Sequence, residues 1–127
     1  MTKEENAYFF DTYALIEIIK GNFNFKKYID CLIITTIFNI AELNYNLKKE
    51  MNVNLADQYT KDYFDFVVEV NLEDIKKAMD LKKQHKYMSI PDCIGFMVAK
   101  KHQVKFLTGD NDFKDMENVE FVKAYMQ

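Results

Sequence analysis

Carboxylate side chains follow two apolar segments of this chain, at the points where those segments would end as β-strands. The segment Val104–Thr108 is rich in β-branched and aromatic residues, which favours a buried strand, and Asp110 and Asp112 follow its turn. The shorter apolar segment Ala7–Phe10 runs straight into Asp11. Because ligands of open α/β sheets bind outside the carboxyl ends of the strands, both segments predict an acidic site at one edge of a sheet.

A third acidic position, Glu42, lies within a helix that the sequence predicts over Thr36–Glu50. Helical spacing places Glu42 on one face with Phe38, Ala41 and Tyr45. A carboxylate on an apolar face is costly unless it is paired, protonated or bound to a metal ion. The alternative interpretation is a glutamate at the edge of that face, whose side chain reaches solvent.

A fourth acidic position, Asp92, opens the predicted helix Ile90–His102, whose interior is almost entirely apolar. Ser89 is a favourable cap for this helix, and the proline that follows suits its first turn. Aspartate is itself a favoured capping residue, so Asp11 and Asp112 have a structural alternative as helix caps.

Helices that follow parallel strands begin at the edge where the strands end, so all four acidic positions can meet there. Four carboxylates at one edge repel one another, and one or more would stay protonated unless divalent cations were bound. An all-oxygen site without His or Cys suits Mg²⁺ or Mn²⁺ rather than zinc. Such ions polarise phosphoryl oxygens and activate water for in-line displacement. They would also let a protein of net charge −3 bind a polyanion.

Short strands alternate with helices along the chain, which predicts a parallel α/β sheet with helices on both faces. The predicted strands are Ala7–Phe10, Cys31–Thr35, Val67–Val70, Val104–Thr108 and Val119–Val122. The predicted helices are Tyr13–Lys20, a short turn or helix over Phe23–Ile29, Thr36–Glu50, Leu55–Phe66, Asn71–Lys86, Ile90–His102 and a short helix over Phe113–Met116. No repeat or linker interrupts this pattern, so residues 1–127 are expected to form a single domain.

The composition is that of a globular protein, with 49% hydrophobic and 29% charged residues. All 17 basic residues are lysines, so a phosphate contact must use ammonium groups, backbone amides or a metal rather than guanidinium groups. Cys31 and Cys93 lie in apolar runs and are expected to be buried free thiols. The polar N-terminus lacks a signal segment and no apolar run approaches a membrane span, so a cytoplasmic location is expected.

Four segments that contain these acids also occur in a characteristic order. They are Phe10–Leu15, Thr36–Leu43, the apolar helix that Asp92 opens and that continues to Ala99, and Leu107–Phe113, which is the most specific. In this order they resemble the PIN-domain ribonucleases, in particular the small single-domain toxins of the VapC type. The resemblance extends from the first predicted strand to the last.

The resemblance implies a PIN-like three-layer α/β/α fold around a mostly parallel sheet of about four to five short strands. It implies an Mg²⁺- or Mn²⁺-dependent endoribonuclease that hydrolyses RNA phosphodiester bonds through a metal-activated water. Asp11, Glu42, Asp92 and Asp110 match the acids that catalyse and hold the metal, and Asp112 matches an assisting acid. Thr108 matches a hydroxyl that braces the site, and Thr12 is a lesser candidate for that work.

The resemblance also implies partners. Toxins of this type usually form homodimers, cleave structured RNA such as tRNA or rRNA, and are silenced by a cognate antitoxin whose tail enters the active-site groove. Lysines are the only side chains here that could provide permanent positive charge toward RNA, and binding by them should weaken as salt increases. The candidates are Lys26, Lys27, Lys100, Lys101 and Lys105.

Two alternatives remain open at the level of the sequence. One is a stand-alone PIN nuclease in RNA processing, which often carries an additional RNA-binding or zinc module for which this length has no room. The other is a catalytically silent PIN-like subunit that binds through its groove or dimer face. Metal-dependent cleavage that is lost when any of the four acids is neutralised would distinguish the nuclease from the silent subunit.

Overall fold

The computed structural model describes residues 6–125, which form a sheet of four parallel strands. The strands are β1 (Ala7–Phe10), β2 (Leu32–Ile34), β3 (Lys105–Thr108) and β4 (Val119–Phe121). Their order across the sheet is β2-β1-β3-β4, so β1 and β3 occupy the centre. The predicted parallel sheet of four to five short strands is therefore confirmed, with four strands in this part of the chain.

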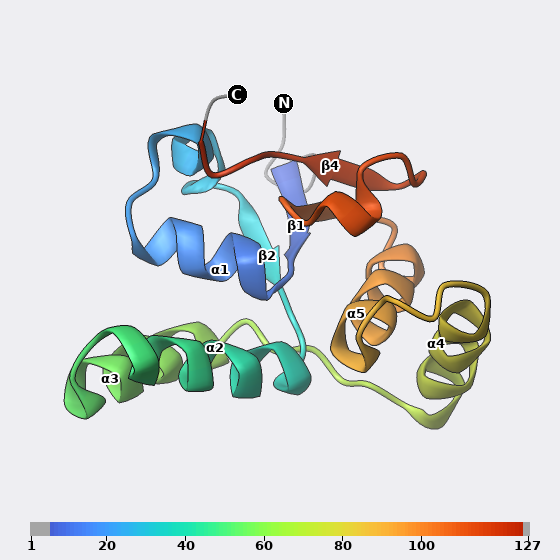
Figure 1. The fold of residues 1–127 in the computed structure, drawn as a ribbon, viewed down its shortest axis with the longest axis horizontal. Helices are drawn as coiled ribbons and strands as arrows, with labels where there is room; N and C mark the ends of the chain where they lie inside the picture. The colour runs from blue at the N-terminus through green and yellow to red at the C-terminus, as the bar shows by residue number, and fades with distance from the viewer. Residues whose placement is uncertain (1–5, 126–127) are drawn as a thin grey trace.

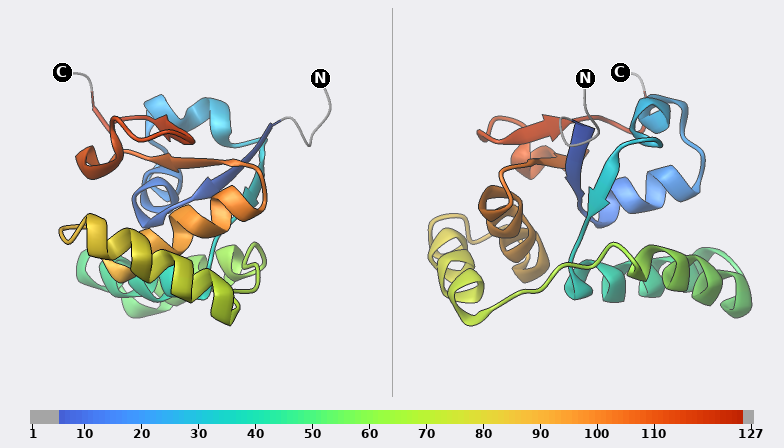
Figure 2. Two further views of the ribbon diagram at one scale, coloured as in Figure 1. Left: turned by 90° about the vertical axis from the view of Figure 1, so that its right-hand side faces the viewer. Right: turned by 180° about the vertical axis from the view of Figure 1, so that it is seen from behind.

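Helices cover both faces of this sheet (Figures 1 and 2). They are α1 (Thr12–Ile19), η2 (Phe23–Tyr28), α2 (Ile37–Glu50), α3 (Val53–Phe64), α4 (Leu72–Gln84), α5 (Ile90–Lys101) and the short η3 (Asn111–Phe113). On one face α5 packs against the strands with α4 outside it. On the other face lie α1 and η2, with α2 and α3 stacked beside α1.

Neighbouring residues of the central strands point into two separate cores. Phe9 and Phe106 face α4 and α5, and their rings stack with centroids 5.4 Å apart. Phe10 and Leu107 face α1, η2 and α2. All four side chains are fully buried. Alternation of this kind, with both faces covered, is what a parallel sheet between two helical layers requires, so the three-layer prediction is confirmed.

The predicted strand Val67–Val70 is wrong. Val67 makes an isolated parallel bridge with Thr35, but the segment forms no strand among the residues that the structure describes. Its β-branched residues contribute to packing instead, because Val68 and Val70 contact the core formed by α4, α5 and the sheet. The segment is an extended connection from α3 to α4 whose valine side chains are half-buried. Within residues 6–125 its backbone pairs laterally only with Thr35, so the pairing does not extend into a strand.

Two helix boundaries also differ from the prediction because capping side chains act earlier than the apolar periodicity indicates. Asn52 accepts a hydrogen bond from the Leu55 amide at 2.8 Å, so α3 begins at Val53. The short helix predicted over Phe113–Met116 is instead η3, since Asp110 caps the preceding turn.

The two cysteines differ in burial. Cys93 is buried within α5, as predicted, whereas Cys31 is only half-buried beside the start of β2. Cys31 lines a hollow of about 310 Å³ together with Tyr8 and Tyr28, which explains its partial exposure. Within residues 6–125, no helix combines the length and the apolar character needed to cross a membrane.

Candidate functional site

Asp11 joins the end of β1 to the start of α1 and is almost completely buried, with 2% of its surface exposed. Its Oδ1 accepts a hydrogen bond from the Ala14 amide at 2.9 Å, as a helix cap does. Its Oδ2 accepts a hydrogen bond from the hydroxyl of Thr108, the last residue of β3. The capping interpretation of Asp11 is therefore correct, and the second oxygen ties the two central strands together at their carboxyl ends.

The same Thr108 hydroxyl also orients the chain after β3. It accepts a hydrogen bond from the Asp110 amide at 3.0 Å, and Asp110 Oδ1 in turn accepts one from the Asp112 amide at 2.9 Å. Gly109 is required between them, because a Cβ at this position would collide with the ring of Tyr13. Thr108 thus contacts both Asp11 and the loop that carries Asp110, and its role in supporting a catalytic site stays a prediction.

Asp92 reaches the same edge because α5 lies directly on the sheet. A Cβ on Gly95 would come within 2.8 Å of the Phe9 ring, so only glycine allows this close approach. Ser89 accepts a hydrogen bond from the Asp92 amide at 3.1 Å and fixes the first turn of the helix, as predicted. The start of α5 is thereby held at the carboxyl ends of the strands.

Glu42 is oriented by a polar network that the sequence analysis did not identify. The Thr12 hydroxyl donates a hydrogen bond to Glu42 Oε1 at 2.8 Å. The side-chain amide of Asn39 in turn donates a hydrogen bond to the Thr12 hydroxyl at 3.3 Å. Asn39 is fully buried, and its Oδ1 accepts from the Thr36 hydroxyl at 2.6 Å. A signal was present in the sequence, because Asn39 precedes Glu42 by one helical turn and shares its side of α2.

The apolar face assigned to Glu42 is not the buried face of α2. Tyr45 is 66% exposed and Ala41 is also exposed, whereas Ile40 and Leu43 enter the core. Glu42 itself is half-buried at the boundary, as the alternative of an edge glutamate expected. The contact with Thr12 on α1, rather than an apolar face, turns its carboxylate toward the sheet edge.

Burial and, to a lesser extent, neighbouring negative charges raise the pKa of two acids at this edge, Asp11 and Asp92. Burial raises the pKa of Asp11 to about 8; the hydrogen bonds from Thr108 and Ala14 oppose this shift, and the charges of Asp92 and Asp110 add to it. A buried carboxylate surrounded by other carboxylates is thus protonated at neutral pH when no cation is present.

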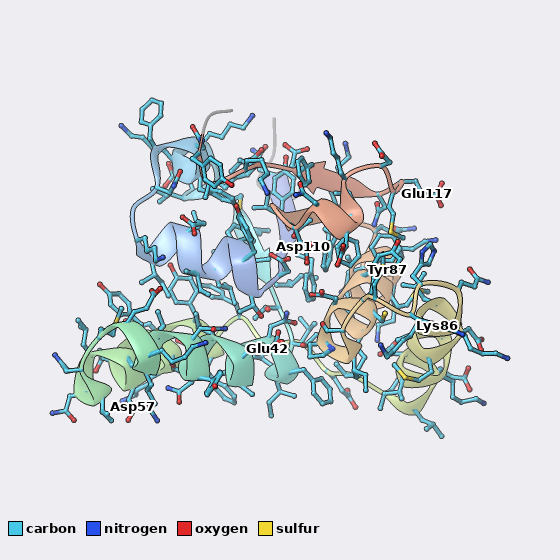
Figure 3. All side chains as sticks on the ribbon, in the orientation of Figure 1. Glu42, Asp57, Lys86, Tyr87, Asp110 and Glu117 are labelled. Atoms are coloured by element: carbon cyan, nitrogen blue, oxygen red, sulfur yellow. The ribbon has the colours of Figure 1, made fainter. Side chains whose placement is uncertain are left out.

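Asp92 links the remaining acids into one electrostatic group. Burial raises its pKa to about 6, with the negative charge of Asp110 next in importance; a hydrogen bond with Ser89 opposes the shift, and Glu42 and Asp112 add to it. Figure 3 shows Glu42 and Asp110 in the middle of the molecule, near the start of α1. The structure therefore brings all the sequence-predicted acids to one edge of the sheet.

The donor set at this edge fits Mg²⁺ or Mn²⁺, since it consists of carboxylate oxygens and hydroxyls without His or Cys. Within residues 6–125, no three acidic, His or Cys side chains converge closely enough to form a ready-made cage. Magnesium does not require one, because it commonly binds through one or two carboxylates and keeps several waters. The pKa values of Asp11 and Asp92 are raised mainly by burial and further by neighbouring carboxylates, and a bound cation would favour the ionised form of both.

Comparisons with known proteins identify the family to which this fold belongs. The model of the PIN domain family matches residues 8–119, which is most of the chain. The chain belongs to the PIN domain family. No curated protein sequence matches it.

Solved structures with the same fold include two complexes that contain toxins or VapBC proteins. A toxin–antitoxin complex from Klebsiella pneumoniae superposes with a TM-score of 0.74 at 19% identity, covering 94% of this chain and 99% of the other. VapBC2 from Rickettsia felis, bound to a DNA fragment from their promoter, superposes with a TM-score of 0.73 at 14% identity, covering 92% and 99%. At such low identities the likeness concerns the fold.

The five lysines predicted to face RNA lie in segments that lead into strands of this PIN domain. Lys26 and Lys27 belong to η2, which leads into β2, Lys100 and Lys101 end α5, and Lys105 begins β3. All of them precede a strand, whereas the acids follow a strand or open a helix. Lys101 is ion-paired with Asp74 at 2.6 Å and Lys100 with Glu117 at 3.6 Å. Their contact with RNA stays a prediction.

A lysine that the sequence analysis did not single out lies beside the acids instead. The Nζ atom of Lys123 donates to the Gly109 carbonyl oxygen at 2.9 Å and lies 3.4 Å from Asn111 Oδ1. These two residues flank Asp110 in the chain. The available signal was the position of Lys123 directly after the last predicted strand, which is the same signal that identified Asp11.

Proposed function

We propose that this PIN domain is an Mg²⁺- or Mn²⁺-dependent endoribonuclease whose acidic edge hydrolyses RNA phosphodiester bonds. The observation that carries the proposal is the electrostatic group formed by Asp92 with Asp110, Glu42 and Asp112. Closely spaced carboxylates are typical of functional sites, where a bound cation or a shared proton offsets the repulsion between them.

The residues of the chain have distinct tasks in this proposal. When bound, a divalent cation supplies a Lewis acid for the phosphoryl oxygens and lowers the pKa of water. Asp92 and Asp110 are the acids that would hold it, while Asp11 lies deeper and is braced by Thr108. Glu42 approaches from α2, with one oxygen held by Thr12, and leaves its other oxygen for a cation or a water.

We further propose that the protein is the toxin of a toxin–antitoxin pair. The support is the fold shared over nearly the whole chain with structures of toxin–antitoxin complexes. The partners proposed with this role are a cognate antitoxin, a second copy of the chain and a structured RNA such as tRNA or rRNA.

The test is cleavage of a total RNA pool with Mg²⁺ or Mn²⁺, with and without EDTA. Asp92→Asn and Asp110→Asn are expected to reduce the cleavage rate by at least about 100-fold, because several kcal/mol of transition-state stabilisation are lost. Asp80→Asn is the matched control, because Asp80 is an exposed acid on α4, away from this edge.

Circular dichroism of each variant establishes that it is folded. Metal-dependent fragments that vanish in both site variants and persist in Asp80→Asn would support the nuclease. Cleavage that survives in the folded site variants would contradict it. A protein that neither cuts RNA nor binds Mn²⁺ would favour the silent binding subunit.

A further inference from the structure

We propose that single-stranded RNA leaves the acidic edge across a surface of lysines and aromatic rings at the carboxyl end of β4. This β4–η2 surface consists of Lys27, Lys114, Phe121, Lys123 and Tyr125. The proposal rests on the proposed function in that it assigns a path to the substrate of the same site. It differs from the five lysines predicted from the sequence, of which only Lys27 belongs to the surface.

Lys123 connects this surface to the acids. Its ammonium group lies against the Gly109 carbonyl oxygen and near Asn111, on the loop that carries Asp110. The same ammonium group lies 5.7 Å from the ring centre of Tyr13, 5.8 Å from that of Phe121 and 5.9 Å from that of Tyr125. The aromatic rings hold the cation in place without neutralising its charge, because a ring attracts a cation through its quadrupole.

Two hollows run outward from Lys123 and share its aromatic neighbours. One, of about 450 Å³, is lined by Asn111 and Lys114 and lies next to the acidic loop. The other, of about 490 Å³, extends to Asn24 and Lys27 on η2. Phe121, Lys123 and Tyr125 line both. The surface is thus continuous from the loop of Asp110 to η2.

Hydrogen bonds hold the backbone of this surface in place. Asn24 donates its side-chain amide to the Lys123 carbonyl oxygen at 3.1 Å, and the Ala124 amide donates to the Tyr13 hydroxyl at 2.9 Å. Figure 1 shows the chain after β4 passing toward η2, the light-blue turn that follows α1. The lysines therefore project from a fixed frame rather than from a free end.

Among residues 6–125, the lysines of this surface form no ion pair with a carboxylate. The ion pairs in residues 6–125 use other lysines, so none of Lys27, Lys114 and Lys123 has a carboxylate oxygen within 4.0 Å there. Glu120 is the acid that lines the larger hollow, and its carboxylate accepts a hydrogen bond from the Tyr28 hydroxyl at 2.5 Å. Unpaired cations in a protein of net charge −3 favour an anionic partner.

Lysines spaced along a groove with exposed aromatic rings are typical of surfaces that bind single-stranded nucleic acid. The cations follow the phosphates, and the rings stack on bases whatever their sequence. Tyr125 is 61% exposed and can provide such a stacking ring, while Lys123 would meet a phosphate next to the cleaved bond. A duplex would offer no free base to stack on Tyr125, so the occupant we infer is an unpaired strand or loop.

The experiment measures binding without cleavage. A fluorescein-labelled single-stranded RNA of about 12 nucleotides, within the range of site sizes of such surfaces, is titrated with the Asp92→Asn protein, and anisotropy is recorded over a salt series. In this background Lys27→Ala, Lys114→Ala and Lys123→Ala together should reduce the salt slope by about 2, roughly 0.7 for each lost phosphate contact. Tyr125→Ala should weaken binding about fivefold or more and leave the slope unchanged.

The matched control is Lys77→Ala, because Lys77 is an exposed lysine of α4 on the opposite layer; it should bind as the parent does. Affinity and slope unchanged in the triple variant would overturn the proposal. So would a loss caused by Lys123→Ala alone while the Lys27→Ala/Lys114→Ala variant binds normally, because Lys123 would then only brace the acidic loop. If the wild-type protein cuts no RNA but the triple variant loses binding, the proposed nuclease fails and the surface stands.

Discussion

Asp11 and Asp74 are both nearly buried aspartates at the start of a helix, with 2% and 5% of their surfaces exposed, yet their surroundings are opposite. Asp74 lies 2.6 Å from the Lys101 ammonium group and exchanges hydrogen bonds with Asn71 in a capping box. Burial tends to raise the pKa of Asp74, but Lys101 and Asn71 outweigh it and the pKa is lowered. Asp11 has a hydroxyl and an amide as donors and acids as further neighbours, and its pKa is raised to about 8.

The comparison separates a carboxylate that stabilises the fold from one that costs stability. The negative charge of Asp74 is balanced by Lys101 of α5, so the aspartate links α4 to α5 without leaving an uncompensated buried charge. Asp11 lacks such a partner among the described residues, so its ionised form is disfavoured until a ligand supplies a balancing positive charge, as is expected at a functional site. Burial alone would not have distinguished the two residues.

The largest expected difference between them is in activity. Asp11→Asn should reduce RNA cleavage by at least about 100-fold, because the acidic group loses a charge on which a cation depends. Asp74→Asn should leave the cleavage rate of the folded protein within about twofold, since Asp74 lies outside the acidic edge and its hydrogen bonds support the fold rather than the site. Cleavage rates of the two variants at saturating Mn²⁺ make the comparison. Equal losses in both would show that Asp11 is only another structural aspartate.

The second difference is in how stability depends on pH. The folded-state pKa of Asp11, about 8, lies above its ordinary value of 3.8. Its contribution to the free energy of unfolding is therefore fully present below about pH 4 and is lost as the pH rises to about 8. Asp92, with a pKa of about 6, also lowers the free energy of unfolding as the pH rises, between about pH 4 and pH 6. In EDTA, the free energy of unfolding should therefore fall with rising pH, by up to about 1.4 kcal/mol per pH unit for each proton.

Urea unfolding at several pH values checks this expectation, with Asp11→Asn as the diagnostic variant. The variant should show a shallower decline between about pH 4 and pH 8, because the ionising group is gone while the amide oxygen can still cap α1. Asp74 has the opposite sign: its pKa is lowered, so its contribution is lost only as the pH falls below about 4. An unchanged pH profile in Asp11→Asn would contradict the assigned shift.

A smaller effect is expected from removing the structural aspartate. Asp74→Ala should reduce the free energy of unfolding by about 1–2 kcal/mol, since it removes both the capping box and the partner of Lys101. Lys101→Met should cost less, because the capping hydrogen bonds persist. Thermal and urea unfolding of the single and double variants measure the coupling between the two side chains. Strict additivity would contradict the ion pair.

An effect on activity smaller than that of Asp11→Asn is expected at the support of Glu42. Thr12→Val removes the hydroxyl that holds Glu42 Oε1 and should lower the cleavage rate or the metal affinity by about tenfold, as changes behind a metal ligand do. Thr60→Val on α3 is the matched control, because the Thr60 hydroxyl donates to the Ala56 carbonyl and accepts from the Asn44 side chain but contacts none of the acids of the site. A Thr12→Val protein with wild-type Mn²⁺ affinity and rate would remove Glu42 from the site.

Much of the fold follows from local signals in the sequence. The strand Ala7–Phe10, the cap at Ser89 and the acids after β1 and β3 were all predicted, because each depends on neighbours in the chain. Val67–Val70 was predicted wrongly, since β-branched composition indicates burial but does not provide a neighbouring strand. The buried face of α2 was also assigned wrongly, because the packing of α1 and α3 decides which face is covered.

The sequence by itself determined which residues carry charge at the ends of strands and the starts of helices, and hence that the acids can meet at one edge. The tertiary structure alone decided which charges are balanced. It paired Lys101 with Asp74, left Asp11 with a hydroxyl, and brought Lys123 against the loop of Asp110 from β4. The physical reason is that capping and periodicity act within a few residues, whereas charge balance depends on distances between segments that only folding brings together.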